Sequence, residues 1–350
     1  MPIVADVVDA VVGGDTHADS HTLVMLAAPS GGQITTRSVD NDADGYAAAV
    51  SWIAEHAPGP RLIIGLEGTR SYGVGLARAL AAAGLTVVEV DRPKRAQRRG
   101  RGKSDPIDAG HAAMATLRMD TDRLPTPRVD GDREALRILL VARRELTGAK
   151  TRQINQLRAL LLGGDDTDRA LARGAITHAW LARIARRRGS ANDTREQTIR
   201  RAEAHRLALA IRTGLDALTA NRNQLIKILT DLTPGLLDRP GVGPVSAAQA
   251  VVTWSHPGRC RNDAAFAALA GAAPIPASSG KIVRWRLSRG GDRQLNRALH
   301  DITMARWRSD PRTQTYITRR RAQNKTDGEI RRALKRYIAR ELYRALNNAA

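Results

Sequence analysis

Apolar runs separated by short polar turns fill the beginning of the chain, and their lengths predict strands. Residues 7–15, 21–28 and 33–39 are rich in Val, Ile, Leu and Thr, and each run is short enough for one strand. Only a few polar residues, around Thr16–Ser20, separate the first run from the second. We therefore expect these three strands to pair as an antiparallel set.

The pattern then changes to an alternation of helices and strands. The predicted elements are a helix over 45–56 capped within Asp42–Asp44, a strand over 61–66, a helix over 71–83 that Gly84 ends, and a strand over 85–90. Three leading strands followed by alternation favour an α/β sheet of the ribonuclease-H-like kind. A doubly wound nucleotide-binding fold would begin strand–helix–strand, and no GxGxxG motif follows the first strand.

Two long helices, over 133–162 and 194–232, are predicted next because leucines recur in them at heptad spacing. The heptad positions are Leu139, Leu146 and Leu160, interrupted by Gln153, and then Ile211, Leu218, Leu225 and Leu232. The pattern predicts an antiparallel, coiled-coil-like arm. Such an arm serves either in dimerisation or as a pair of helices packed inside one subunit.

The last region is predicted to be mostly helical. The stretch 239–251 (RPGVGPVSAAQAV) has the form of a helix-hairpin-helix turn, in which glycines allow close approach of a phosphate to the backbone. A short helix over 263–273 and a small-residue loop over 273–281 follow. We expect three domains, comprising residues 1–128, 129–235 and 236–350.

Charge is distributed unevenly along the chain. The 350 residues include 56 Lys and Arg against 35 Asp and Glu, a net charge of +21. Residues 1–90 nevertheless carry −6, and residues 91–350 carry +27. A basic excess of this size most often binds nucleic acid. Because aromatic residues make up only 3%, we expect binding mainly through phosphates rather than base stacking.

Several protein classes are excluded by composition. Cys260 is the only cysteine, which excludes an intrachain disulfide and a cysteine-ligated metal cluster and fits a reducing compartment. No apolar run reaches the roughly 20 residues of a membrane helix, and the N-terminus lacks the pattern of a secretory signal. We therefore expect a cytoplasmic protein with no membrane partner.

Four carboxylates occupy positions where the predicted sheet would gather them. Asp15 ends the first strand, Glu67 ends the fourth, and Asp105 and Asp108 share one face of a helix that Ser104 is expected to cap. In a ribonuclease-H-like sheet the ends of the first and fourth strands are neighbours. Carboxylates converging there would repel one another unless divalent cations lay between them. Two Mg²⁺ ions in such a site can activate a nucleophile and stabilise the leaving oxygen of a phosphodiester. His17 and His111, nearby in sequence, are interpreted as ordinary polar residues.

Two further segments are candidates for contact with nucleic acid. The loop 92–103 contains seven basic residues: Arg92, Lys94, Arg95, Arg98, Arg99, Arg101 and Lys103. The small-residue loop carries adjacent hydroxyls, Ser278 and Ser279, and is followed by a second basic set: Lys281, Arg284, Arg286, Arg289 and Arg293. A serine needs a base, a metal or strong electrostatic help to act as a nucleophile, and arginines stabilise charge that develops on a phosphate. On composition alone, the interpretation of this loop as an ordinary flexible turn is favoured, because SSG is a common turn sequence.

These motifs resemble those of one family. Asp15 in GGDTH, Glu67 in GLEGT, and Asp105 with Asp108 in KSDPIDA look like the DEDD motif of the insertion-sequence 110 transposases, relatives of the Piv invertases. The segments RPGVGPVSAAQAV, FAALAGAAPIPASSGK and RLSRGGDRQLNRAL resemble the C-terminal transposase domain of that family. The resemblance covers nearly the whole chain and keeps the order of its parts.

The resemblance implies a RuvC-like catalytic domain, a helical arm and a serine-bearing domain in a bacterial, nucleoid-associated recombinase. It implies that the four acids hold Mg²⁺ or Mn²⁺, and that Ser279, the serine directly before Gly280, forms a covalent phosphoserine with DNA. It also implies guidance by a non-coding bridge RNA that pairs with donor and target DNA. A homo-oligomer, dimer or tetramer, is expected. The long helical arm motivates a further hypothesis, that the acid domain of one subunit and the serine domain of another form a composite active site. The alternatives are a Holliday-junction nuclease that uses the acids and water, and a nucleic-acid-binding protein without catalysis.

Overall fold

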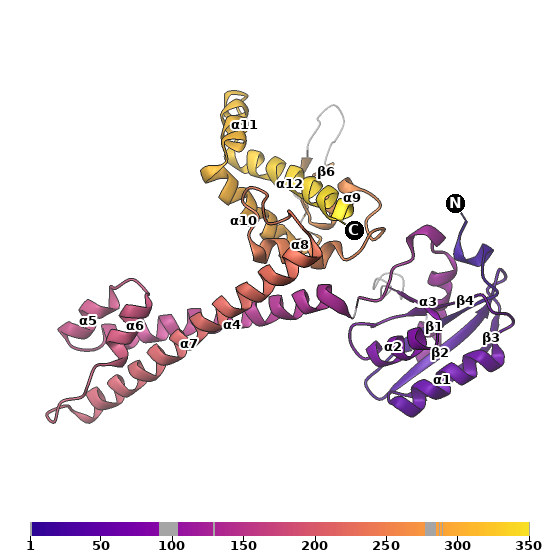
Figure 1. Ribbon diagram of the computed structural model, residues 1–350, viewed down its shortest axis with the longest axis horizontal. Coiled ribbons are helices and arrows are strands. Elements are labelled where there is room, and N and C mark those ends of the chain that lie inside the picture. Colours follow the sequence, from indigo (N-terminus) through magenta and orange to yellow (C-terminus); the bar gives the residue numbers. More distant parts are fainter. Residues whose placement is uncertain are drawn as a thin grey trace. The chain divides into compact units, whose positions relative to one another are not determined.

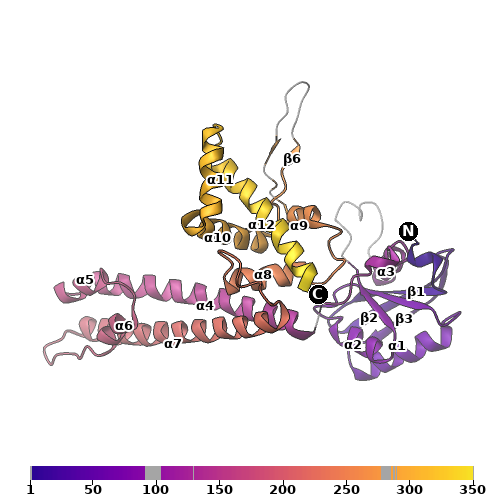
Figure 2. The same cartoon turned by 45° about the horizontal axis from the view of Figure 1, so that its top comes forward.

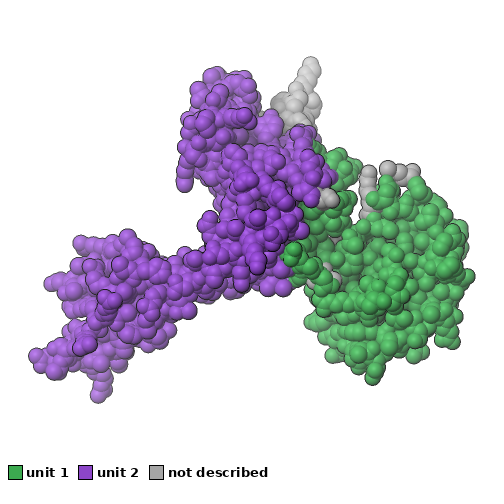
Figure 3. Space-filling view, viewed as in Figure 1, with its two compact units in different colours: residues 1–134, 254–265, 350 green, residues 135–253, 266–349 purple. Residues whose placement is uncertain are grey.

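The computed structural model divides into two compact units, coloured separately in Figure 3. Unit 1 comprises residues 1–134, 254–265 and 350, and unit 2 comprises residues 135–253 and 266–349. The residues described are 2–90, 104–128, 130–276, 285–286, 288 and 290–349. The basic loop 92–103 and residues 277–284, with both candidate serines, lie outside this part of the chain.

Unit 1 is built on a five-stranded sheet with the order β3-β2-β1-β4-β5 (Figure 1). Its strands are β1 (Ala10–Thr16), β2 (Ser20–Ala27), β3 (Gln33–Asp40), β4 (Leu62–Leu66) and β5 (Thr86–Glu89). The first three pair antiparallel, whereas β4 pairs parallel with both β1 and β5. The prediction of a mixed sheet, with three antiparallel strands joined to parallel ones, is confirmed.

Helices cover both faces of this sheet. Figure 2 shows α1 (Ala43–His56) and α2 (Val74–Ala82) on one face and α3 (Asp105–Leu117) on the other. Alternate strand residues pack on opposite sides, so Val12 contributes to the core under α1 and α2, and Val11 to the core under α3. Because side chains alternate along β1, Asp15 belongs to the same face as Val11, the face that α3 covers.

Local details differ from expectation at three helix or strand ends. The first strand begins at Ala10 rather than at residue 7, because the amides of Val7 and Val8 donate to the Val4 carbonyl in a 3-10 turn. Helix α2 begins three residues later than predicted. Ser104 precedes α3, but its side chain makes no capping hydrogen bond; its carbonyl accepts instead from the amides of Ile107 and Asp108. The predicted cap of α1 is confirmed, since Asp42 accepts from the Gly45 amide at 2.8 Å.

The two long predicted helices are present as α4 (Gly131–Leu162) and α7 (Arg195–Leu232), which lie side by side in Figures 1 and 2. They pair within one chain: Arg143 Nη1 donates to the Leu218 carbonyl at 3.0 Å, and Asn221 Nδ2 donates to the Leu139 carbonyl at 2.9 Å. Dimerisation through this arm stays a prediction.

The heptad prediction is right for α7 and displaced for α4. Ile211, Leu218 and Leu225 are buried, and Leu232 is half-buried. In α4 the buried leucines are instead Leu136, Leu140, Leu157 and Leu161, while the predicted Leu139, Leu146 and Leu160 are half-buried. The middle of α4 is polar, and there Arg143 Nη1 donates to Asn221 Oδ1 at 3.3 Å. Leucine spacing alone therefore predicts a set of buried positions that differs from the set the structure shows.

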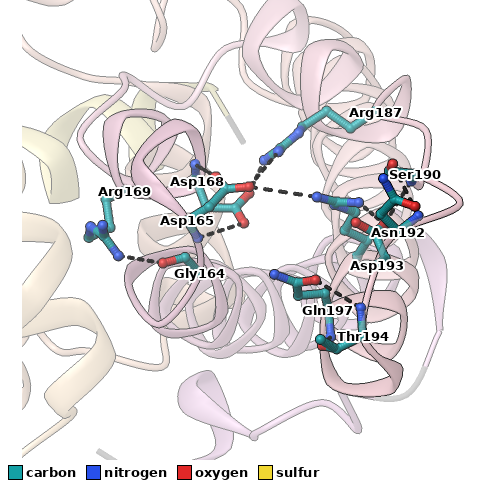
Figure 4. Close-up of polar contacts among 11 residues, drawn as sticks. Gly164, Asp165, Asp168, Arg169, Arg187, Ser190, Asn192, Asp193, Thr194 and Gln197 are labelled. Carbon is teal, nitrogen blue, oxygen red and sulfur yellow. Dashed lines mark hydrogen bonds and ion pairs between the residues drawn. The ribbon is translucent and has the colours of Figure 1, made fainter.

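Two short helices that the sequence pattern did not reveal, α5 (Asp166–Ala172) and α6 (His178–Ala185), close the far end of the arm. Trp180 anchors them, because it is buried and its indole donates to the Leu171 carbonyl at 2.9 Å. Figure 4 shows the polar contacts here, in which Arg187 bridges Asp165 and Asp168. Arg201, a residue of α7, pairs with Asp193 and approaches Asp165.

The remainder of the chain is mostly helical, as predicted. It contains α8 (Pro244–Trp254), α9 (Asp263–Leu269), α10 (Arg293–Ser309), α11 (Pro311–Ala322) and α12 (Asp327–Ala349), with a small pair of strands, β6 (Ile275–Pro276) and β7 (Trp285–Arg286). A bidentate pair between Arg306 and Glu341, at 2.8 and 3.0 Å, joins α10 to α12. Across the described ranges, every helix is too short or too polar to cross a bilayer.

Candidate active site at the carboxyl edge of the sheet

The ends of β1 and β4 bring two carboxylates to one place. The parallel register pairs Gly14 with Leu66, and the Glu67 amide donates to the Gly14 carbonyl at 3.0 Å. Asp15, the last residue but one of β1, and Glu67, the residue directly after β4, therefore lie at neighbouring strand ends. Both are buried, with 4% and 2% of their surfaces exposed. Burial of two ionisable carboxyls at one edge is costly unless a cation or hydrogen bonds compensate.

Glycines in these strands allow α3 to approach the sheet closely. A Cβ atom at Gly13 would overlap the backbone of Ala109 and Ala113, and one at Gly65 would overlap the hydroxyl of Thr116. Helix α3 therefore lies in direct contact with β1 and β4. Gly65 shares a strand face with Glu67, so Glu67, like Asp15, belongs to the α3 side of the sheet.

The first turn of α3 supplies the other two acids. Asp105 is one turn before Ala109, and Asp108 is one turn before the buried Ala112, so both lie on or next to the face that packs on the sheet. Asp105 is the more accessible, with 53% of its side chain exposed against 14% for Asp108. Negative charge in a first helical turn is also favourable to the helix.

His17 joins two of these acids, which the sequence interpretation missed. Its Nε2 lies 3.1 Å from Asp15 Oδ2 and 3.5 Å from Asp105 Oδ1. One ligand atom from each of Asp15, His17 and Asp105 lies within 4.8 Å of the others. Glu67 and Asp108 are outside this group of three; Asp108 instead approaches His111, with 3.9 Å between Oδ1 and Nδ1. The alternation of β1, which puts residue 17 on the Asp15 face, is the signal that could have identified His17.

The donor set fits a divalent cation. Carboxylate oxygens are the ligands that Mg²⁺ and Mn²⁺ prefer, and Asp15 and Asp105 present them from two different elements. Asp15 is buried while Asp105 is open to solvent, so an ion between them would keep positions for water or a phosphate oxygen. The imidazole of His17 is a further possible ligand, or a hydrogen-bond donor to the acids.

A cluster of arginines lies at the next strand end along the same edge. Glu89, the last residue of β5, accepts from Arg128 Nε at 2.7 Å and lies 3.5 Å from Arg70 Nε. Burial raises the pKa of Glu89, but the hydrogen bonds and charge of Arg128 outweigh it and lower the pKa overall. Burial and the nearby charges of Arg128 and Arg70 lower the pKa of Arg133 to about 10. Here, arginines neutralise the strand-end carboxylate.

The predicted nucleic-acid contacts fall largely outside the described residues. Those outside are the loop residues Arg92, Lys94, Arg95, Arg98, Arg99, Arg101 and Lys103, both serines, Lys281, Arg284 and Arg289. Arg286 in β7 and Arg293 at the start of α10 are described, and both are exposed.

The GGDRQLN segment has a clear structural role beside the serine loop. Asp292 caps α10 by accepting from the amides of Gln294 and Leu295 at 2.8 and 2.9 Å. Its own amide donates to the Leu269 carbonyl at 2.7 Å, and Asn296 Nδ2 donates to the Ala270 carbonyl at 2.7 Å. Gly291 has φ +91°, and a Cβ there would overlap the Leu269 carbonyl. The segment thus fixes the start of α10 against the residues that lead into the serine loop.

Comparison with known proteins agrees with this arrangement. The IS110 DEDD transposase family model matches residues 12–164, which contain all four acids, and a second model, described as the transposase IS116/IS110/IS902 family, matches residues 235–318. The chain is 39% identical over 111 residues to the insertion element IS110 uncharacterized 43.6 kDa protein of Streptomyces coelicolor. That alignment covers 31% of this chain and 27% of the relative, about a quarter of its length. With both of its halves matched to the same group of transposases, the chain belongs to the IS110 transposase family.

Proposed function

We propose that this transposase cuts and rejoins DNA strands of a mobile element in a reaction that depends on divalent metal. The observation that carries the proposal is the convergence of Asp15, His17 and Asp105 at the carboxyl edge of the sheet, where Glu67 ends the neighbouring strand. The strand order and the single helix across β1 and β4 support a RuvC-like assignment for this domain. We propose all four acids, with Asp108, as the metal-binding set.

In this proposal the acids hold Mg²⁺ or Mn²⁺, which when bound lowers the cost of charge that develops at the reacting phosphate. The chain's own residues hold the site in place: Gly13 and Gly65 let α3 press onto the strands, which brings Asp105 to Asp15. Asp15 is buried, so the proposal takes its carboxylate to be held in place before DNA binds.

We propose Ser279 as the nucleophile, on the strength of the family resemblance and of the neighbouring basic residues. Its oxygen would attack the phosphorus of a DNA phosphodiester and lose its proton. The new bond is Oγ–P, the bond that breaks joins phosphorus to the 3′ oxygen, and that oxygen leaves as a 3′ hydroxyl after gaining a proton. Attack by the 3′ hydroxyl of another strand on the phosphoserine reverses these changes and rejoins DNA.

The nucleic-acid partners follow from charge and resemblance together. Residues 91–350 carry a net +27, so contacts with the phosphates of donor DNA, target DNA and a bridge RNA are proposed for the loop 92–103 and for the basic C-terminal region. A homo-oligomer whose subunits share active sites completes the proposal. Sequencing of nucleic acid that copurifies with the protein identifies the RNA.

Denaturing electrophoresis of a reaction with labelled DNA tests the chemistry. The wild type and Ser278→Ala should form a label that migrates with protein in detergent, and Ser279→Ala should form none while still binding DNA. Label that persists in Ser279→Ala and vanishes in Ser278→Ala would move the nucleophile by one residue. Cleavage without any covalent label in the wild type would instead indicate a nuclease that uses water.

A further inference from the structure

A cavity of about 730 Å³ opens in unit 2, bounded by α10, the α11–α12 turn and α12. Figures 1 and 2 show these helices packed together, with β6 beside them. The Asp292 and Asn296 contacts described above fix one wall. Helix α12 forms another wall, and its buried side chains include Leu334, Ile338 and Leu342. Helices α10 and α12 and the α11–α12 turn therefore form much of the cavity, and residues 271–274, 286, 288 and 290 complete its lining within the described part of the chain.

Its lining is strongly basic. Of the residues that the structure describes, eight Lys and Arg side chains line it against one carboxylate, a net charge of +7. Arg332, Arg336 and Arg340 follow one another at single turns of α12, about 6 Å apart along the helix axis. A row of guanidinium groups at regular spacing matches a linear polyanion better than it matches a single small anion.

Glu329, the carboxylate in the described lining, makes its hydrogen bonds at the start of α12. Glu329 Oε2 accepts from the amide and the hydroxyl of Thr326, both at 2.9 Å, where it caps α12, and these bonds lower the pKa of Glu329. Lys335 Nζ donates to Asn296 Oδ1 at 3.0 Å, and burial lowers the pKa of this amine. An anion in the cavity would favour the charged form of Lys335.

Size and shape restrict the occupant. A DNA duplex has a major groove about 12 Å wide, and the whole duplex is too large for a cavity of 730 Å³. Tyr337 lines the cavity, meets the Tyr316 ring in an edge contact with 6.0 Å between the centroids, and still exposes 56% of its surface, which leaves area for a base to stack. Phosphate contacts combined with an exposed aromatic ring are the usual means of binding a single strand.

The position of the cavity in the chain points to DNA. Gly271–Pro274, which line it, precede the segment 277–284 that contains Ser279, and Arg286, Ser288 and Gly290, which also line it, follow that segment. A strand in the cavity therefore lies against both flanks of the segment that carries the proposed nucleophile.

We propose that this cavity binds a short length of single-stranded DNA, with phosphates against the α12 arginines and a base stacked on Tyr337. The proposal rests on the proposed function, because it takes the strand to be the one that Ser279 attacks. It adds the arginines of α12 and Tyr337, which no sequence motif indicated, to Arg286 and Arg293 of the predicted basic set.

Two sets of variants of the full-length protein test it by binding of fluorescein-labelled single-stranded DNA across a salt series. Arg293→Gln, Arg332→Gln and Arg336→Gln together remove three cavity charges. Arg297→Gln, Arg308→Gln and Arg312→Gln remove three exposed charges from the same helical region outside the cavity. Each phosphate contact with a single strand contributes about 0.7 to the slope of log K against log salt, so the cavity set should lower the slope by about 2 and the control set by much less.

Tyr337→Leu should weaken binding about tenfold, whereas Tyr72→Leu, which changes an equally exposed tyrosine of unit 1, should not. Equal slopes in the two arginine sets, or a loss confined to RNA of the same sequence, would overturn the proposal. The covalent label at Ser279 is read separately. If the wild type forms the covalent label but the two arginine sets have equal salt slopes, only the cavity assignment is overturned. A cavity-specific slope change without label overturns only the phosphoserine chemistry.

Discussion

The carboxyl edge of the unit 1 sheet and the cavity of unit 2 are opposite in both charge and construction. The edge gathers carboxylates at adjoining strand ends, within residues 1–90 that carry −6, and in the first turn of α3 that follows them in the chain. The cavity gathers eight basic side chains, most of them on helices, against one acid. A cation suits the first region and a polyanion suits the second. In our proposal, metal binding and strand binding therefore belong to different compact units of the chain.

A contrast within the edge itself sharpens this point. Glu89 at the end of β5 is neutralised by Arg128 and Arg70, whereas Asp15 at the end of β1 lies against His17 and, through it, against a second carboxylate. Asp15 and Asp105 share the single imidazole of His17, so this pair of carboxylates keeps negative charge that a cation can balance. An arginine-paired carboxylate leaves none, so we interpret Glu89 as structural and Asp15 as functional.

The largest effect is expected at the acids. Asp15→Asn or Glu67→Gln should abolish strand transfer, because each removes a proposed metal ligand. Changing a residue that only hydrogen-bonds to a metal ligand typically costs roughly 10–100-fold, and we expect a larger loss here. Each change removes one charge from a crowded set, so circular dichroism should show a folded protein. Glu55→Gln is the control, because that side chain on α1 is 77% exposed. Wild-type transfer by Asp15→Asn in Mg²⁺ would break the comparison.

A different outcome is expected at Glu89. Glu89→Gln leaves Arg128, whose side chain is 10% exposed, without its charged partner, and should lower the free energy of unfolding by about 3 kcal/mol. The folded pKa of Glu89 is below its usual 4.5, so its stabilisation is complete above pH 4.5 and is lost as the pH falls through the folded value. Denaturant unfolding at several pH values should therefore show the variant's deficit shrinking in acid. A constant deficit would contradict the ionic explanation.

A smaller effect on stability is expected where α3 meets the sheet. Gly13→Ala introduces a Cβ that overlaps the backbone of α3 and should lower the free energy of unfolding by about 1–3 kcal/mol. Gly110→Ala in the same helix is the matched control. Its Cβ meets nothing within 4 Å, so this change should stabilise the helix by about 0.5–1 kcal/mol. Equal unfolding midpoints for the two variants would mean that α3 does not press on β1.

Strand ends could be predicted from sequence because apolar runs and polar turns mark them locally. That is why the sequence predicts Asp15 and Glu67 at neighbouring strand ends. His17 was missed, since its approach to Asp105 depends on how α3 crosses β1. The cavity depends on the packing of α10 against α12, which no local pattern encodes. The register of α4 was displaced because Arg143 and Asn221 replace leucines in the middle of the arm.

The central claim is that the carboxyl edge binds a divalent cation through Asp15. Titration of Mn²⁺ into the full-length wild type and Asp15→Asn, with the free ion followed by its electron paramagnetic resonance signal, tests this claim without requiring catalysis. We expect the wild type to remove Mn²⁺ from the free signal and Asp15→Asn to leave most of the ion free. Equal binding of Mn²⁺ by the two proteins would contradict it.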